Sequence, residues 1–308
     1  MHLSIVRALL RRLARFAVVL FGVSTVVFLA VRLAGDPAAV LIPQGASAAE
    51  VATLRRELGL DQPFVIQFAL FWQGILHGDF GRSAALNQPA LDAVLQALPV
   101  TLQLTAAALL IVIVVGVPLG VAAAVWRGGW VDALARTIAT LTQAMPSFWL
   151  GLVLIVIFAV KLRWFPASGW GSLEEAVLPA MTLALYSLGR VSRLMRGSML
   201  EAMSQAWTLT ARAKGLFPRR IVWVHQFRNA LVPVVTLLGV EMGILLSGAV
   251  ITETVFGIPG MGRLAVTAVL GSDYAVVQAS VFVAALLITG INLLADTTTI
   301  AIDPRLRN

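Results

Sequence analysis

The sequence contains no cysteine, three histidines and few charged residues, which make up 12% of the chain. Without cysteine, neither a disulfide nor a thiolate metal site can form. His2, His77 and His225 lie in separate segments, so no metal cluster is expected. A Gly-rich loop ending in Gly-Lys-Ser or Gly-Lys-Thr is also absent, which excludes nucleotide binding through a P-loop. With no Ser/His/Asp set or carboxylate pair either, the sequence indicates neither an enzyme nor a bound cofactor.

Apolar residues, in contrast, make up 59% of the 308 residues. Soluble domains typically contain about 45–50%, so the composition is that of a membrane protein. A membrane-spanning helix needs about 20 mainly apolar residues. The sequence predicts an all-α polytopic membrane protein with six transmembrane helices, the fourth of them short, at 13–31, 101–125, 137–160, 176–188, 231–252 and 275–300.

The basic residues are unevenly distributed between the loops. The N-terminus, the loop after the second span, the segment 190–233 and the C-terminus contain most of the Lys and Arg residues. These segments lie on one side of the membrane if there are six spans, and the positive-inside rule makes that side the cytoplasm. The net charge of +8 therefore reflects topology and not nucleic-acid binding. The first span is interpreted as a retained anchor, because Arg32, Gly35 and Asp36 follow it in place of a signal cleavage site.

The external segment after the first span has helix signals of its own. Ser47 and Glu50 have the spacing of a capping box, and Gly59 follows as a stop signal. The next apolar run, 64–76, is too short to cross a membrane, so we expect it to lie at the interface or against the bundle.

The longest polar interruption in the second half of the chain is 190–233, here called the basic loop. It contains eight basic residues and one acid, Glu201. Gly215 ends one helical pattern and Pro218 begins another, which is typical of a helix-turn-helix hairpin. Within it, Arg190, Arg193 and Arg196 share one helix face and are expected either to face headgroups or to bind an acidic partner.

The basic loop resembles a known one. The order Ala-Arg-Ala-Lys-Gly-Leu at 211–216 and Arg-Asn-Ala-Leu-Val-Pro at 228–233 is similar to the cytoplasmic coupling loop of permease subunits of binding-protein-dependent ABC importers, in the dipeptide/oligopeptide/nickel branch. That motif has Glu-Ala-Ala before its glycine, where this chain has Leu209, Thr210 and Ala211. Other segments similar to the family occur along nearly the whole chain, at 35–37, 58–63, 78–81, 253–262 and 303–305.

The resemblance implies a chain with an anchor helix and periplasmic segment, 1–98, and a permease domain, 99–308. It implies a bacterial inner-membrane location, a second homologous permease subunit, two ATP-binding subunits that hold ATP and Mg²⁺, and an extracytoplasmic substrate-binding protein. Peptides are the implied cargo, with a nickel chelate or a glutathione-like solute as alternatives. The residues implied to contact the ATPase are Ala211, Arg212, Ala213, Lys214, Gly215, Leu216, Arg219 and Arg220.

Several polar residues and one proline within the apolar runs are candidates for the translocation path. Glu241 lies near the centre of the fifth span, where an ionised acid costs about 2.5–3.5 kcal/mol, and no basic residue lies in the neighbouring spans as drawn above. It is expected either to line the path or to form a hydrogen bond at a subunit interface. Pro146, followed by Ser147, predicts a kink in the third span that serves either the path or packing. Asp36 and Asp296 are expected to be structural.

An ion-coupled secondary carrier is the alternative class of protein. Such carriers are typically built from inverted repeats with broken helices and several intramembrane acids. The sequence shows one central acid and no obvious repeat, which favours the importer subunit.

Overall fold

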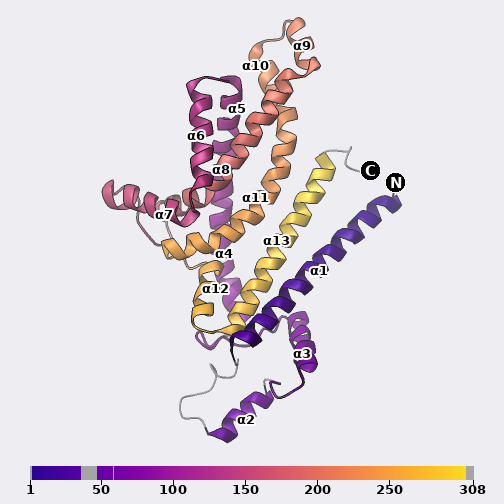
Figure 1. Ribbon diagram of the computed structural model, residues 1–308, viewed down its shortest axis with the longest axis vertical. Helices are drawn as coiled ribbons and strands as arrows, with labels where there is room; N and C mark the ends of the chain where they lie inside the picture. Colours follow the sequence, from indigo (N-terminus) through magenta and orange to yellow (C-terminus); the bar gives the residue numbers. More distant parts are fainter. Residues whose placement is uncertain (1, 36–46, 58, 303–308) are drawn as a thin grey trace. The chain divides into compact units, whose positions relative to one another are not determined.

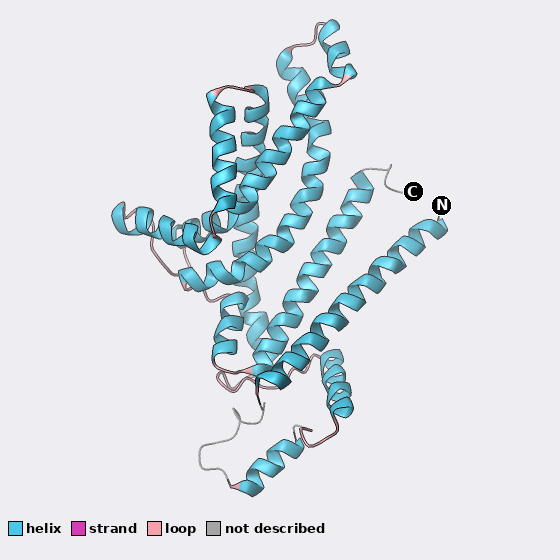
Figure 2. Cartoon of the chain, viewed as in Figure 1, coloured by secondary structure: helices cyan, strands magenta, loops and turns pink. Residues whose placement is uncertain are grey.

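The computed structural model describes residues 2–35, 47–57 and 59–302, and these residues form helices with no strand (Figures 1 and 2). The α-helices are α1 (His2–Ala34), α2 (Ala48–Glu57), α3 (Phe64–His77), α4 (Ala90–Ile111), α5 (Val117–Val125), α6 (Trp130–Ala144), α7 (Ser147–Leu154), α8 (Leu173–Ser204), α9 (Ala206–Ala213), α10 (Pro218–Arg220), α11 (Phe227–Phe256), α12 (Met261–Leu270) and α13 (Tyr274–Ile302). Three π-helical segments join consecutive helices or extend one of them: Val112–Gly116, Ile155–Lys161 and Ile221–Gln226.

Four helical stretches in the described part of the chain are long and apolar enough to cross a membrane: Arg12–Leu33, Ala90–Val125, Pro218–Phe256 and Tyr274–Ala295. A fifth candidate is the pair Trp130–Ala144 and Ser147–Lys161, which is bent by 112°. The expected short fourth span lies inside α8, which does not belong to this set. An all-helical membrane protein is therefore confirmed, and the number of six spans stays a prediction.

Pro146 produces a sharper change of direction than the expected kink. Met145 and Pro146 are both extended, with ψ of 137° and 140°, so α6 ends before them and α7 begins at Ser147. Because proline cannot donate the amide hydrogen bond of a helix interior, it starts a new helix here and does not bend a continuous one.

The chain forms two compact units, and each is described by itself. The first comprises 1–101 and 259–289. Its core contains Ile75, Val94 and Val276, from α3, α4 and α13. The ring of Phe28 on α1 contacts Phe64, Phe68 and Phe71 of α3 at centroid distances of 5.1–5.4 Å. Helix α3 therefore packs against α1, which was one of the two expected alternatives.

The second unit comprises 102–258 and 290–308 and is built around α8. Helices α5, α6, α7 and α11 all pack on α8 (Figure 1). Small residues permit this packing: a Cβ atom at Gly120 of α5 would lie 2.5 Å from the carbonyl oxygen of Ser192 on α8. Gly239 of α11 approaches Ala295 of α13 just as closely, an example of the close helix packing that small residues permit in membrane proteins.

Most local signals in the sequence are confirmed. Ser47 and Glu50 form both hydrogen bonds of the capping box. Gly59 and Gly215 have φ of 63° and 72°, the left-handed conformation that glycine adopts easily. The helical pattern that was expected to end at Gly215, however, is interrupted at Gln205, where ψ is 146°. Thr208 Oγ1 donates to the carbonyl oxygen of Ala202 at 2.8 Å and closes this bend.

The close contact at Gly120 gives a stability prediction. Replacing Gly120 with alanine places Cβ against a backbone carbonyl that cannot move away, so the variant should lose about 1–3 kcal/mol of unfolding free energy. The matched control is Gly197→Ala on α8, where nothing lies within 4 Å of the new Cβ and alanine gains up to about 1 kcal/mol of helix propensity. Thermal unfolding in one lipid composition compares the two variants. Equal stability would contradict the close packing of α5 on α8.

Candidate functional site

Glu241 of α11 has no solvent-accessible surface. Its Oε2 accepts a hydrogen bond from Ser187 Oγ at 2.5 Å, and its Oε1 lies 3.2 Å from Arg190 Nη1. Ser187 and Arg190 are three residues apart on α8 and therefore share one face. Arg190 lies just beyond residue 188, where the fourth span was expected to end, and it reaches Glu241 because α8 remains helical well beyond that residue.

Arg190 connects this buried carboxylate to more polar surroundings. Its side chain is 33% exposed, and its guanidinium carbon lies 5.9 Å from the centre of the Tyr186 ring. A buried carboxylate is tolerated when a cation and further hydrogen bonds compensate for its lost hydration. Arg190 and Ser187 supply these two contacts, so the structure explains why the acid can lie in an apolar helix.

A second carboxylate, Asp132 of α6, joins α6 to α8. Arg196 binds it in a two-pronged arrangement, with Nε 2.7 Å from Oδ1 and Nη2 3.0 Å from Oδ2. The Gly128 amide also donates to Oδ2 at 3.0 Å, and Asp132 is 1% exposed. Two parallel hydrogen bonds between arginine and a carboxylate are directional as well as strong. This contact therefore holds the turn before α6 against α8.

The two ion pairs change the interpretation of the arginine stripe on α8. Arg190 and Arg196 bind carboxylates of this chain, and Arg193 donates to the carbonyl oxygen of Ala139 at 3.4 Å. A stripe facing headgroups or an external acidic partner was the expectation. It is wrong for Arg190 and Arg196, which bind acids of this chain, whereas for the exposed Arg193 it stays a prediction. Asp132 was missed by the sequence reasoning. The available signal was an acid in the first turn of an amphipathic helix, next to a loop that contains the basic residue Arg127.

A cavity of about 400 Å³ lies within the second unit, beside the Ser187 hydroxyl. Its lining includes Pro146 and Ser147 at the start of α7, together with Ser187 and Ser247. None of its lining residues is charged. Two of the predicted path residues, Pro146 and Ser147, therefore share a cavity. The third, Glu241, lies behind its wall and reaches it through Ser187.

The predicted hairpin in the basic loop is confirmed as a structure: α9 leads to Gly215, and α10 begins at Pro218. The amides of Gly215 and Leu216 bond back to the carbonyls of Arg212 and Ala211, which closes the turn. Phe217 is 81% exposed at its tip. Of the predicted partner-contacting residues, Ala211 is buried and Leu216 half-buried, whereas the others are exposed: Arg212, Ala213, Lys214, Gly215, Arg219 and Arg220.

The structure describes no side-chain contacts for the two remaining candidate residues. Asp36 lies outside the described residues, and Asp296 lies within α13 at a position whose side chain is not described. Among the described residues, no group of His, Asp and Glu side chains could hold a metal ion.

Comparisons with known proteins cover nearly the whole length of the chain. The family described as "Binding-protein-dependent transport system inner membrane component" matches residues 116–308, and its N-terminal companion family matches residues 5–105. A Brucella abortus protein, named as a permease protein of a peptide transport system, is 40% identical over 97% of this chain and 98% of its own length. The glutathione transport system permease protein of Salmonella paratyphi A is 39% identical over the same shares.

Two solved structures share the fold. The MetNI methionine ABC transporter in inward-facing conformations has a chain that aligns with a TM-score of 0.57 at 20% identity, covering 68% of this chain and 96% of its own. An amino acid ABC transporter crystallised with histidines aligns with a TM-score of 0.51 at 18% identity, covering 70% and 94%.

The contact between Glu241 and Arg190 generates a prediction about stability. Replacing Arg190 with methionine leaves a buried carboxylate without its cation, which should lower the unfolding free energy by about 3 kcal/mol. Replacing Glu241 with glutamine as well removes the stranded charge, so the double variant should recover much of that loss. A double-mutant cycle by thermal unfolding in one lipid composition measures the coupling. Additive effects of the two substitutions would contradict a direct contact.

Proposed function

Because the chain belongs to the family of binding-protein-dependent transport system inner membrane components, we propose that it is the permease subunit of an ATP-driven importer of small peptides. Relatives with about 40% identity over nearly the whole chain support this cargo, since their names refer to peptide and glutathione transport, and glutathione is itself a tripeptide. A nickel chelate is a less favoured cargo, because none of the relatives described above is named for nickel transport.

The hairpin of residues 206–226 is proposed to dock on an ATPase subunit. The observation that carries this proposal is its exposed surface, which combines two apolar residues, Phe217 at the tip and Leu209 of α9, with four cations, Arg212, Lys214, Arg219 and Arg220. Basic groups around an apolar centre suit a partner cleft with an acidic rim. By this proposal ATP and Mg²⁺ are held by the partner, and this chain transmits the motion that ATP binding causes.

The two ends of the hairpin continue into the helices that carry the buried ion pair. Helix α8 carries Ser187 and Arg190, whereas α11 carries Glu241 and follows the π-helical segment Ile221–Gln226 directly. A displacement of the hairpin therefore acts on two helices that are joined by this ion pair. We propose that this movement opens and closes the cavity lined by Pro146, Ser147 and Ser187, which would form part of the translocation path.

The proposed assembly contains a second homologous permease subunit, two ATP-binding subunits and an extracytoplasmic substrate-binding protein, in the bacterial inner membrane. Both chain termini and the hairpin would face the cytoplasm, and α2 and α3 would face the other side. Asp36 and Asp296 are kept as structural residues in this proposal.

The docking proposal predicts a sharp difference between two substitutions at one position. Gly215 has φ of 72° with nothing within 4 Å of a new Cβ, so the cost there is conformational and not steric crowding. Valine in this left-handed conformation costs about 1–2 kcal/mol, whereas asparagine adopts it more easily. Gly215→Val should therefore weaken copurification with the ATPase and lower peptide-stimulated ATP hydrolysis by about 5–30-fold.

Gly215→Asn should retain most of the copurification with the ATPase and most of the peptide-stimulated ATP hydrolysis. The measurements are copurification of the tagged chain with coexpressed neighbouring subunits and ATP turnover in lipid, with binding protein and peptide present. A chain that purifies alone, ignores both substitutions and transports cargo along a proton or sodium gradient would contradict the proposal in favour of an ion-coupled carrier.

The proposed orientation can be tested with single cysteines, since the chain has none of its own. Asp61→Cys and Lys214→Cys each introduce one thiol at an exposed position. In spheroplasts, a membrane-impermeant maleimide should label the cysteine at 61 at once and the cysteine at 214 only after the membrane is permeabilised. The reverse pattern would overturn the orientation.

A further inference from the structure

The turn between α5 and α6, residues 126–130, carries two exposed tryptophans. Trp126 is 59% exposed and Trp130 is 77% exposed. The turn lies between two candidate membrane-crossing segments, because the stretch Ala90–Val125 ends immediately before it and the bent pair begins at Trp130. Tryptophan is enriched at the membrane interface, where its ring is apolar and its N–H group finds a hydrogen-bond partner. The turn therefore lies at the boundary between hydrocarbon and water.

Two arginines accompany the tryptophans. Arg127 lies between them in the sequence, is exposed, and forms no ion pair with another residue that the structure describes. Arg136 follows Trp130 by six residues on α6, about 9 Å along the helix axis, and its side chain is 61% exposed. A long arginine side chain can cover much of that distance by extending towards headgroups. Both guanidinium groups can therefore reach the interface.

Positive charge is in excess at this turn. Asp132 is shared by two cations: Arg196 binds both of its carboxylate oxygens, at 2.7 and 3.0 Å, whereas Arg136 Nε lies 3.4 Å from Oδ1. Two cations and one anion give this ion-paired group a net charge of +1, and Arg127 adds one more positive charge. The surface therefore attracts an anionic partner.

Asp132 also fixes the shape of the turn. The Gly128 amide donates to Asp132 Oδ2 at 3.0 Å, and the Gly129 amide donates to the carbonyl oxygen of Trp126 at 3.0 Å. Gly128 has φ of 78°, the left-handed conformation that glycine adopts easily. The side chains of the turn are thus presented by an ordered backbone, so little conformational entropy is lost when a partner binds.

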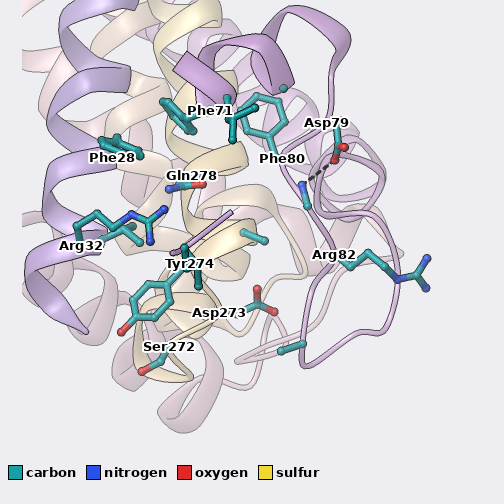
Figure 3. A pocket seen from close by; sticks show the side chains of 17 residues that line it. Phe28, Arg32, Phe71, Asp79, Phe80, Arg82, Ser272, Asp273, Tyr274 and Gln278 are labelled. Atoms are coloured by element: carbon teal, nitrogen blue, oxygen red, sulfur yellow. Dashed lines mark hydrogen bonds between the residues drawn. The ribbon is translucent and has the colours of Figure 1, made fainter. Parts of the chain in front are cut away.

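The charged residues around a pocket of about 300 Å³ in the first unit differ in this respect (Figure 3). Asp79 accepts a hydrogen bond from the Gly81 amide at 2.9 Å, which Figure 3 draws as a dashed line. The pocket is lined by two cations and two anions, so its charges balance: Arg32, Arg82, Asp79 and Asp273. An excess of one sign next to exposed aromatic rings distinguishes the turn at 126–130 from this pocket.

We propose that the turn at 126–130, together with Arg136, binds the headgroup of an anionic phospholipid. The phosphate lies at Arg127 and Arg136, and the rings of Trp126 and Trp130 contact the glycerol backbone and the upper acyl chains. Figure 1 shows the hairpin of α9 and α10 at the same end of the second unit, reaching further out than the turn. A protein docked on the hairpin leaves the turn at the level where the apolar segments end, so a lipid is the better match. The inference depends on neither the cargo nor the orientation of the chain.

The test measures which lipid surrounds the turn in nanodiscs that contain equal amounts of phosphatidylglycerol and phosphatidylcholine with the same acyl chains. Because the chain has no cysteine, Ala133→Cys introduces a single thiol for a fluorescent label. Ala133 is exposed and lies three residues from both Trp130 and Arg136. An acyl-chain nitroxide that quenches the label is carried by phosphatidylglycerol in one sample and by phosphatidylcholine in the other. Stronger quenching by the first measures the preference for the anionic lipid.

Each arginine should contribute about fivefold to this preference, which corresponds to about 1 kcal/mol per basic residue near an anionic surface. Arg127→Gln and Arg136→Gln should each lower it by that factor, whereas Arg127→Lys keeps the charge and should retain most of it. The matched control is Arg56→Gln, which removes an exposed arginine from α2 and should leave the preference unchanged. High salt should weaken the preference of the unaltered chain.

Equal quenching by the two lipids would overturn the inference, and so would a preference that survives both glutamine substitutions. An equal loss in Arg56→Gln would also overturn it, since the preference would then come from the overall charge of the chain. The measurement is repeated on the complex with coexpressed ATPase subunits, where the label should stay accessible to both quenching lipids. Loss of quenching by both lipids in the complex would identify a protein as the occupant and contradict the proposed lipid site.

Discussion

A carboxylate that is removed from water needs compensating charge, and Glu241 imposes this requirement on the second unit. The acid lies in an apolar helix with no exposed surface, and its compensation comes from Ser187 and Arg190 on α8. Helix α8 must therefore stay helical past the expected end of its apolar segment and keep one face against α11. Any arrangement that separated these two helices would leave an unpaired charge in low dielectric.

The contact between Asp132 and Arg196 applies the same constraint further along α8, beyond Arg190. The two carboxylates come from different neighbours, α6 and α11, and both are bound by arginines of the same helix. Close contacts at Gly120 and Gly151 place the remaining neighbours, α5 and α7, within van der Waals distance of α8. Helix α8 is thus the element on which the unit is assembled, and the hairpin is attached directly to its end.

Features that depend on a few neighbouring residues were predictable from the sequence. The capping box at Ser47, the left-handed glycine at Gly215 and the short helix α3 follow from local rules. That Arg190, Arg193 and Arg196 share a helix face was predicted, but the pairing of Arg190 with Glu241 was not, because it depends on how α8 packs against α11. The position of Asp132 beside Arg196 depends on how α6 packs, which no local pattern encodes. Pro146 and Ser147 could be named as candidate path residues because proline gives a local signal. Ser187, which lines the same cavity, could not be named, because its position there depends on helix packing.

The π-helical segment Ile221–Gln226 affects the rotation about the helix axis that relates the hairpin to α11. A π-helical turn accommodates one residue more than an α-helical turn, and such insertions occur often at functional sites. Each residue of an α-helix corresponds to about 100° of rotation around its axis. Removal of one residue from this segment would restore regular α-helix and leave the hairpin facing in nearly the same direction relative to Glu241, whereas removal of one residue from the regular α-helix between them would turn the hairpin by about that angle.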